Sequence, residues 1–446
     1  MKAERPLNAL EAIFASCNVR FALLVVMDIN MCGSSDGDNS NFLAELDRKA
    51  TDALRSNVLG HLAIKRKQQD EWSLFTTEAA AVQTKIREIP LGKDYGKFLH
   101  NLVHRETIPA EGPMNVQILR NNSSDQNDNA KYSNVVGLLV NSNHAMVDGR
   151  SLARLIYLAT KSAESLGKSI PYSPPNLQDW KDLVKENDNA KSESRNSEPP
   201  YLLPPHDILS IKELCRNHSS TGSDCFGFEL SGDTINRLRA LLKIRTQGSA
   251  TISGFLAGVI LQSLAQEYDH SNPKALALSM LVDLRPHITL AKGVDVGEIP
   301  QLHGSVTISE STDRLLETGA DSKPNNRNHS LWDLSLSLTH QLKRRIERGE
   351  AHRNTLALTS GKFDQAGPSA TVELSNLGVC QLPEGAKMFT SQRFDGYDGV
   401  SCMVHSESST GCMRWNVSVG EGLDADMIQQ VFQRAFHQCH DLVAEQ

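Results

Sequence analysis

The chain has 446 residues, of which 39% are hydrophobic and 5% aromatic, and its formal net charge at pH 7 is −7. This length is enough for two domains of about 200 residues each. The ordinary apolar content excludes a collagen-like, coiled-coil or wholly disordered chain. The acidic balance argues against general nucleic-acid binding, which needs a basic face to meet phosphates.

Cysteine use and apolar runs bear on the compartment. The eight cysteines are scattered without a Cys-x-x-Cys pair, which is typical of reduced, packed thiols rather than of a disulfide frame or a zinc site. The start, Met1 to Pro6, lacks the basic and then apolar order of a signal peptide, and the run from Phe21 to Met27 is too short to span a bilayer. We expect a cytoplasmic protein with no membrane partner.

Apolar periodicity predicts the elements of the N-terminal half in chain order. Helices are expected over 5–16, 42–54 and 95–103, and strands over 21–29, 116–119 and 135–140. Residues 59–91 read as two or three strands with polar turns. A helix should begin near Arg150, because Leu152, Leu155, Ile156 and Ala159 recur at helical spacing.

The polar, Pro-ending tract at 185–200 is typical of a linker. We therefore divide the chain into an N-terminal subdomain (1–184), a linker or crossover (185–205) and a C-terminal subdomain (206–446). The second half predicts the following elements: strands at 226–230, 275–282 and 371–374, a hairpin at 402–406 and 413–419, and helices at 233–242, 250–268, 331–348 and 427–443. Helices and strands alternate in both halves, which indicates a mixed α/β (α+β) fold of two layered domains.

The segment His144-Ala145-Met146-Val147-Asp148-Gly149 joins a buried strand to an amphipathic helix. A histidine held at the exit of such a strand is rigid and partly desolvated, and it suits a general base. The spacing alone equally fits a helix-start histidine that packs, with Asp148 a first-turn acid favoured by the helix dipole. A metal pair is a third interpretation, but a third ligand at suitable spacing is missing, so we expect no metal site.

Four segments together resemble the coenzyme-A-dependent acyltransferases of the chloramphenicol acetyltransferase fold. They are Arg5-Pro6-Leu7-Asn8-Ala9-Leu10-Glu11, His144 to Gly149, Asp283-Leu284-Arg285-Pro286, and Ser375-Asn376-Leu377-Gly378. Their order looks most like the alcohol acetyltransferase branch, which includes fungal enzymes that acylate secondary metabolites. The resemblance implies two similar subdomains, each a mixed sheet flanked by helices, with a channel between them.

By this resemblance, His144 takes the proton of an acceptor hydroxyl, which attacks the thioester of acyl-CoA directly. Acyl-CoA is then a cosubstrate, and the enzyme needs no metal, redox cofactor or covalent acyl-enzyme. Asp148 resembles a structural strut that points away from the channel and pairs with an arginine, here Arg285, and Gly149 completes the motif. The alternatives are that Asp148 orients His144 as in a hydrolase triad and that Arg285 is a surface arginine.

Ser375 and Asn376 are placed at a strand end that could face the thioester and donate to a developing oxyanion. The alternative is a plain turn in which Gly378 takes a positive φ. Two departures limit the likeness: Asn143 stands where condensation domains usually carry a second histidine, and residues 393–399 only loosely echo the plant-type Asp-Phe-Gly-Trp-Gly motif.

The sequence therefore predicts an O-acyltransferase that moves a short acyl group, such as acetyl, to a small-molecule alcohol. Its partners are that acceptor and acyl-CoA, and by resemblance the protein is monomeric. One rival is a relative that takes its acyl group from a carrier protein. The other is a binding protein that kept this fold without turnover.

Overall fold

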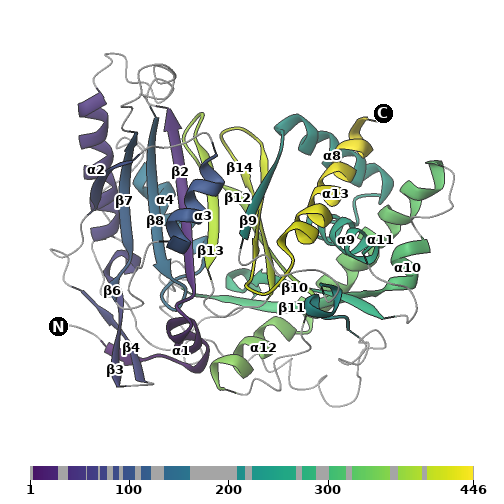
Figure 1. Ribbon diagram of the computed structural model, residues 1–446, viewed down its shortest axis with the longest axis horizontal. Coiled ribbons are helices and arrows are strands. Elements are labelled where there is room, and N and C mark those ends of the chain that lie inside the picture. Colours follow the sequence, from purple (N-terminus) through teal and green to yellow (C-terminus); the bar gives the residue numbers. More distant parts are fainter. Residues whose placement is uncertain are drawn as a thin grey trace.

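The computed structural model describes residues 4–28, 39–56, 58–68, 71–77, 84–89, 94–105, 112–121, 135–160, 208–215, 224–267, 274–287, 301–317, 324–361, 370–393 and 399–444. These residues form two lobes that lie side by side, each built on a large sheet with helices packed against it (Figure 1). The expected linker at 185–205 lies outside the described residues.

The N-terminal lobe is built on the sheet β13-β2-β8-β7-β5, beside a small sheet of order β1-β4-β3-β6. Its elements in chain order are β1 (Glu4–Pro6), α1 (Ala9–Ser16), β2 (Arg20–Asp28), α2 (Asn39–Ser56), η1 (Val58–His61), β3 (Leu62–Gln68), β4 (Glu71–Thr76), β5 (Lys85–Ile89), α3 (Tyr95–Arg105), β6 (Gly112–Pro113), β7 (Asn115–Asn121), β8 (Val135–Asn143) and α4 (Gly149–Thr160).

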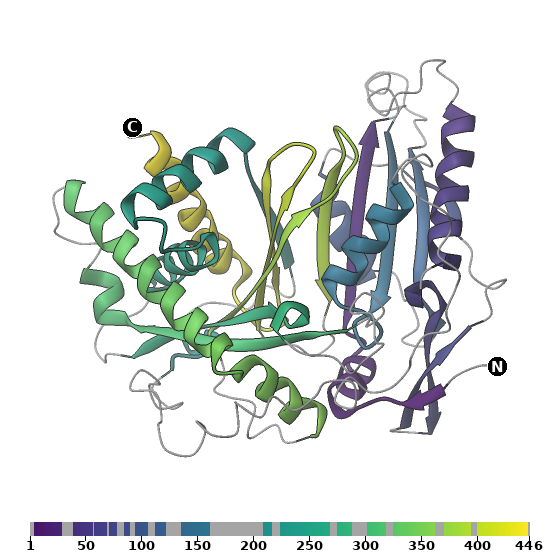
Figure 2. The same ribbon diagram turned by 180° about the vertical axis from the view of Figure 1, so that it is seen from behind.

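Strand β8 is buried along its whole length because the sheet is covered on both faces. Alternate side chains such as Leu138 and Val140 pack against α2 and α4, whereas Val135 and Leu139 pack toward α3. Figure 2 shows α4 lying across the sheet from behind. A continuous apolar run without alternation is the expected sequence of such a doubly covered strand.

The C-terminal lobe is built on the sheet β11-β10-β12-β14-β15-β9, in which β12 runs parallel to both β10 and β14. Its elements are α7 (Ile211–Leu214), β9 (Asp224–Leu230), α8 (Gly232–Arg245), α9 (Ile252–Ala265), β10 (Ala275–Asp283), η5 (Arg285–His287), β11 (His303–Ser311), α10 (Thr312–Glu317), α11 (Pro324–Glu347), α12 (Glu350–Thr359), β12 (Val372–Cys380), β13 (Lys387–Arg393), β14 (Val400–Glu407), β15 (Met413–Val419) and α13 (Ala425–Ala444).

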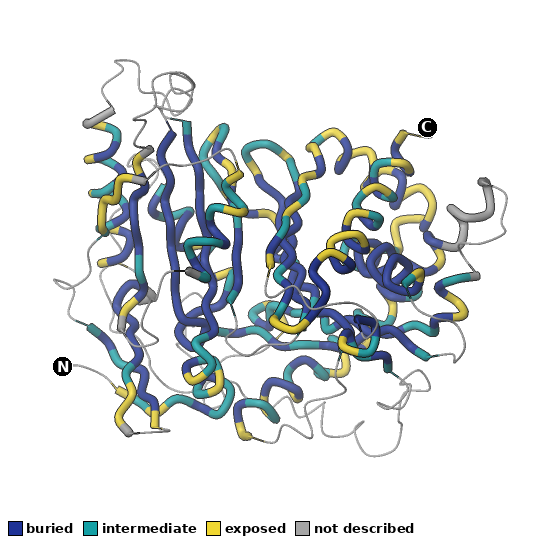
Figure 3. Tube along the Cα trace, viewed as in Figure 1, coloured by how far each residue is buried: buried dark blue, intermediate teal, exposed yellow. Residues whose placement is uncertain are grey.

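One face of this sheet carries the apolar core of the lobe. Leu374, Val404 and Trp415 pack there with α9 and α13, and α9 is buried on nearly all sides. Burial is therefore greatest in the strands and in α9, while the outer turns of the other helices are exposed (Figure 3). The opposite face of the sheet is turned toward the N-terminal lobe, where Met403 joins that lobe's core.

Strand β13 belongs to the second half of the chain but pairs antiparallel with β2, from Lys387 opposite Val26 to Arg393 opposite Arg20. Residues 387–393 thus complete the sheet of the N-terminal lobe, so the expected C-terminal subdomain (206–446) is not one spatial unit. No helix among the described residues is long and apolar enough to cross a membrane.

Two differences from the predicted elements affect the site. Strands β11 and β13 were not predicted, and both contribute residues to the cavity described below. Strand β12 does not end at 374 as expected but continues to Cys380 through an irregularity between Asn376 and Val379, where Gly378 has a φ of +73°. Asn376 Oδ1 accepts the Gly378 N–H at 2.9 Å and holds this bulge in shape.

Candidate active site

His144 lies directly after β8, in the turn that leads into α4. Its backbone N–H donates to the Val19 carbonyl at 2.8 Å, and the side chain of the preceding Asn143 accepts the Ala145 N–H at 2.9 Å. These bonds fix the turn, and the whole residue is only 7% exposed. The bulky β8 side chains therefore anchor a histidine at the edge of the core, as the sequence predicts.

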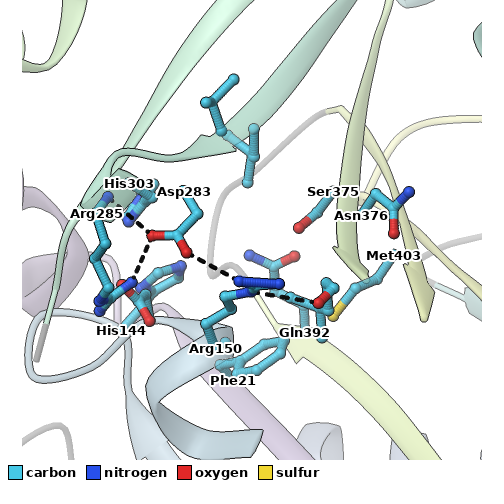
Figure 4. Close-up of a pocket in the computed structure, with 15 residues that line it drawn as sticks. Phe21, His144, Arg150, Asp283, Arg285, His303, Ser375, Asn376, Gln392 and Met403 are labelled. Carbon is cyan, nitrogen blue, oxygen red and sulfur yellow. Dashed lines mark hydrogen bonds and ion pairs between the residues drawn. The ribbon is translucent and has the colours of Figure 1, made fainter. Parts of the chain in front are cut away.

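A cavity of about 60 Å³ lies beside His144, between the two lobes. Figure 4 shows His144 and Arg285 on one side of it and Ser375, Asn376 and Met403 on the other. All six residues proposed from the sequence line this cavity: His144, Asp148, Gly149, Arg285, Ser375 and Asn376. The fold thus brings together segments that are far apart in the chain.

Asp148 is 4% exposed, and its carboxylate accepts hydrogen bonds from structural donors. Oδ2 accepts from Arg285 Nη2 at 2.8 Å and from the Leu302 N–H at 2.9 Å, and Oδ1 accepts the Ser151 N–H at 2.9 Å. Burial alone would raise the pKa of this carboxyl, but the positive charge of Arg285 and the backbone donors outweigh it and lower the pKa. No hydrogen bond joins Asp148 to the His144 ring in the part of the chain described.

Arg285 connects the two lobes at the cavity. Its Nη2 also donates to Ser151 Oγ at 2.9 Å, and its Nη1 donates to Asp283 Oδ1 at 2.9 Å. Asp283 in turn pairs with Arg150 Nη1 at 3.1 Å through its other oxygen. Burial opposes the charge of Arg285, but the two aspartates outweigh it and raise the pKa of its guanidinium. This series of ion pairs, Asp148–Arg285–Asp283–Arg150, therefore connects α4 to the end of β10.

The His144 ring is held between other rings. Phe14 of α1 stacks on it at a centroid distance of 4.7 Å, and His303 of β11 lies at 5.3 Å on a tilted plane. The Gln301 amide donates to the His144 backbone carbonyl, and its nitrogen is 3.3 Å from Nδ1. Burial lowers the pKa of His144 although Asp148 and backbone carbonyls oppose this, so the ring is neutral at pH 7.

The first resembling segment explains how Phe14 reaches His144. Asn8 and Glu11 form a reciprocal capping box at the start of α1, and Arg5 binds both oxygens of Glu11 at 2.6 Å. These contacts fix the direction in which α1 leaves β1. The segment that begins Arg5-Pro6 thus has a structural reason: it places α1 and its Phe14 beside the candidate base.

Ser375 and Asn376 differ in how they meet the cavity. The Ser375 hydroxyl points toward its interior in Figure 4. The Asn376 amide is engaged at both ends, because Nδ2 donates to Ser253 Oγ at 3.0 Å and Oδ1 accepts the Gly378 N–H. Leu377, which lies within the bulge, reaches across into the core of the N-terminal lobe.

Sequence reasoning missed several residues of the site, among them Phe14, Gln301, His303 and Gln392. His303 is partly buried, and burial of its ring, together with the nearby positive charge of Arg285, lowers its pKa to about 4. The alternation of Val306 and Ile308 with polar residues was the available signal for β11. Gln392 had no comparable signal, since apolar residues do not alternate along β13.

A second cavity of about 330 Å³ adjoins the first and shares Arg150, Asp283, Arg285 and Leu377 with it. It is further lined by Arg154 and Tyr157 of α4 and by residues 379–381 after the bulge. Among the described residues, no three His, Cys, Asp or Glu side chains cluster as metal ligands do. The described cysteines are all free thiols.

No protein-family model matches the chain, and no curated protein matches its sequence. The fold is nevertheless similar to solved structures. Trichothecene 15-O-acetyltransferase TRI3 from Fusarium sporotrichioides aligns with a TM-score of 0.69 at 12% identity, over 98% of this chain and 94% of that one. TRI101 from F. graminearum, complexed with coenzyme A and deoxynivalenol, aligns with a TM-score of 0.57 at 13% identity, over 96% of each chain.

The epimerization domain of the third module of tyrocidine synthetase B aligns with a TM-score of 0.57 at 11% identity, over 100% of this chain and 98% of that domain. At these identities the likeness shows the fold. The chain has the two-lobed fold of the chloramphenicol acetyltransferase-like acyltransferases and condensation domains, which confirms the predicted fold class.

Proposed function

We infer that this protein is an O-acyltransferase that moves a short acyl group from acyl-CoA to the hydroxyl of a small-molecule acceptor, in the manner of enzymes that modify secondary metabolites. The observation that carries this proposal is a neutral, rigidly held histidine at a small cavity between two lobes. A neutral imidazole can accept a proton, and the lobes enclose the reacting atoms on both sides.

The reaction proceeds in two steps. The acceptor oxygen attacks the thioester carbonyl carbon while its proton passes to His144, which forms a C–O bond and an oxyanion. The C–S bond then breaks, and the leaving thiolate takes the proton back from the imidazolium. We assign the base to Nε2 because the backbone carbonyls of His144 and Val147 accept a hydrogen bond from the ring and can keep the proton on Nδ1. General-base help of this kind contributes about 10²–10⁴-fold.

Asp148 acts in this scheme as a strut. Its carboxylate is occupied by Arg285, Leu302 and Ser151, so it holds α4 against the C-terminal lobe rather than orienting the imidazole. Gly149 allows the same close approach, since a Cβ there would lie 3.0 Å from Leu377 Cδ2. Ser375 is the hydroxyl placed to donate to the oxyanion, whereas the bonds of Asn376 favour a structural role.

The preference for a short acyl group rests on size. A cavity of about 60 Å³ holds only a few water molecules. It accommodates the reacting carbonyl and a short chain, while the adjoining cavity of about 330 Å³ takes larger parts of a substrate. Coenzyme A is favoured as donor because the similar TRI101 structure binds it, and carrier-protein thioesters are the second candidate because condensation-type domains share the fold.

The test is release of free thiol from acetyl-CoA with and without a panel of alcohols. We expect acceptor-dependent release by the wild type and its loss, by at least about 10²-fold, in His144→Ala. His61→Ala is the matched control, because His61 is also buried but does not line the cavity. A fully active His144→Ala variant would refute the mechanism, and absence of release from any acyl-CoA would refute the choice of donor.

A further inference from the structure

Gln392 lines the cavity from β13, the strand of the second half of the chain that pairs with β2 of the N-terminal lobe. It is 5% exposed and stands opposite Phe21 of β2, which in turn stands opposite Ser142 of β8. Residues paired across strands point to the same face of a sheet, and two strand spacings amount to about 10 Å. Gln392 therefore faces the region next to His144 from the other side of β2, and both residues line the same cavity.

The oxygen end of the Gln392 amide is anchored in protein. Ser401 Oγ of β14, a buried residue, lies 3.2 Å from Gln392 Oε1 and 3.1 Å from Glu373 Oε1 of β12. Glu373 keeps some exposed surface, but burial of its carboxyl raises the pKa. The three polar side chains form a row that leads from the C-terminal sheet to the cavity.

The direction of the hydrogen bonds along this row depends on the protonation of Glu373. A serine hydroxyl has one proton, so Ser401 cannot donate to both neighbours at once. When the Glu373 carboxyl is protonated, it donates to Ser401 Oγ, and Ser401 then donates to Gln392 Oε1. The Gln392 nitrogen is thereby left on the cavity side, where it has no partner among the described residues.

We propose that Gln392 is a catalytic residue whose side-chain N–H donates to the thioester carbonyl oxygen as that oxygen becomes an oxyanion, and that Ser401 and Glu373 are positioning residues that hold the amide in this orientation. In Figure 4 the Gln392 side chain lies between the His144 side of the cavity and the Ser375 side. Two donors from different lobes, Gln392 and Ser375, then converge on one oxygen.

This inference rests on the proposed acyl transfer, because only a reaction with an oxyanion requires such donors. The donor is worth most where water is excluded, and removal of one oxyanion donor in other enzymes lowers kcat by about 10²–10³-fold. Since Ser375 remains, we expect Gln392→Met to lower kcat by about 10- to 100-fold with the KM for acetyl-CoA within about twofold.

The experiment measures kcat and KM for acetyl-CoA in the thiol-release assay for wild type, Gln392→Met, Ser401→Ala, the double variant and Glu373→Gln. Ser401→Ala should lower kcat less than Gln392→Met, because it loosens the donor without removing it. The double variant should be no slower than Gln392→Met alone, because orientation is irrelevant once the amide is absent. Glu373→Gln should keep wild-type kcat, since its amide N–H still donates to Ser401.

Gln262→Met is the matched control, because Gln262 is a buried amide bonded to Gln438, away from the cavity. Melting temperatures identify variants that do not fold, and Gln392→Glu, of the same shape, replaces Gln392→Met in that case. A Gln392 variant with wild-type kcat overturns the inference, as does a double variant whose losses add in full. Absence of His144-dependent release in the wild type overturns the proposed function itself, and with it this inference.

Discussion

Asp148→Asn gives the sharpest test of the strut interpretation. The asparagine offers one oxygen where Asp148 serves three donors, so its amide nitrogen must face either Ser151 or the pair of Arg285 and Leu302. Removing one partner of a buried ion pair costs about 3–5 kcal/mol. Arg285 retains Asp283 and some exposure, so we expect a loss of about 2–4 kcal/mol in the free energy of unfolding.

The measurement is equilibrium unfolding in urea, in which the midpoint should fall while the slope m stays constant. Asp283→Asn is the matched control: it removes the other carboxylate bound to Arg285, but at a more exposed position, and should cost about 1 kcal/mol. Equal shifts of the urea midpoint in both variants would mean that the greater burial of the Asp148–Arg285 pair does not make it more stabilising than the Asp283–Arg285 pair. An unchanged midpoint in Asp148→Asn would remove the strut argument.

Three further outcomes follow from the same geometry. Ser375→Ala should lower kcat by about 10-fold or more without changing the KM for acetyl-CoA, and an unchanged kcat would exclude its donor role. Because the pKa of His303 is about 4, below its usual 6.5, only the unfolded chain binds this proton between those values. The contribution of His303 to the free energy of unfolding is thus full above pH 6.5 and is lost as the pH falls toward 4. In urea unfolding, His303→Gln should reduce that loss by up to about 3 kcal/mol. Curves of unfolding free energy against pH that run parallel for variant and wild type would contradict this. Gly149→Ala places a Cβ 3.0 Å from Leu377 Cδ2 and 3.1 Å from Phe21 Cε1, so urea unfolding should show a loss of about 1–3 kcal/mol, and wild-type stability would mean that these neighbours yield.

The part of the site that the sequence predicts is the part encoded locally. The apolar run of β8, the turn at His144 and the amphipathic α4 lie within one short segment, and each carries its own pattern. Arg285 follows a strong buried strand, β10, for the same reason. The cavity and the meeting of Asp148 with Arg285 depend on how the lobes dock, which no local period encodes.

The residues that sequence reasoning missed lie on strands defined by distant partners. Strand β13 contains Lys387, Ser391 and Arg393 among its seven residues and lacks an apolar face of its own. It becomes a strand because β2 offers it a complete antiparallel register. Its buried backbone groups are satisfied there and by side chains of β14, such as His405 Nε2, which contacts the Met388 carbonyl at 3.0 Å.

The pairing of β13 with the sheet of the N-terminal lobe gives the site its geometry. His144 is fixed by β8, whereas Ser375 is fixed by β12, and these strands belong to different sheets. Two lobes joined only by charged contacts such as Arg285–Asp148 would hold the candidate base and the candidate donor loosely, because ion pairs tolerate displacement. Strand β13 removes that freedom by pairing along its whole length with β2, while Ser401 of β14 anchors its Gln392 from the other lobe. The register of β13 against β2 thus sets how far the candidate base His144 lies from Gln392, the proposed oxyanion donor on β13.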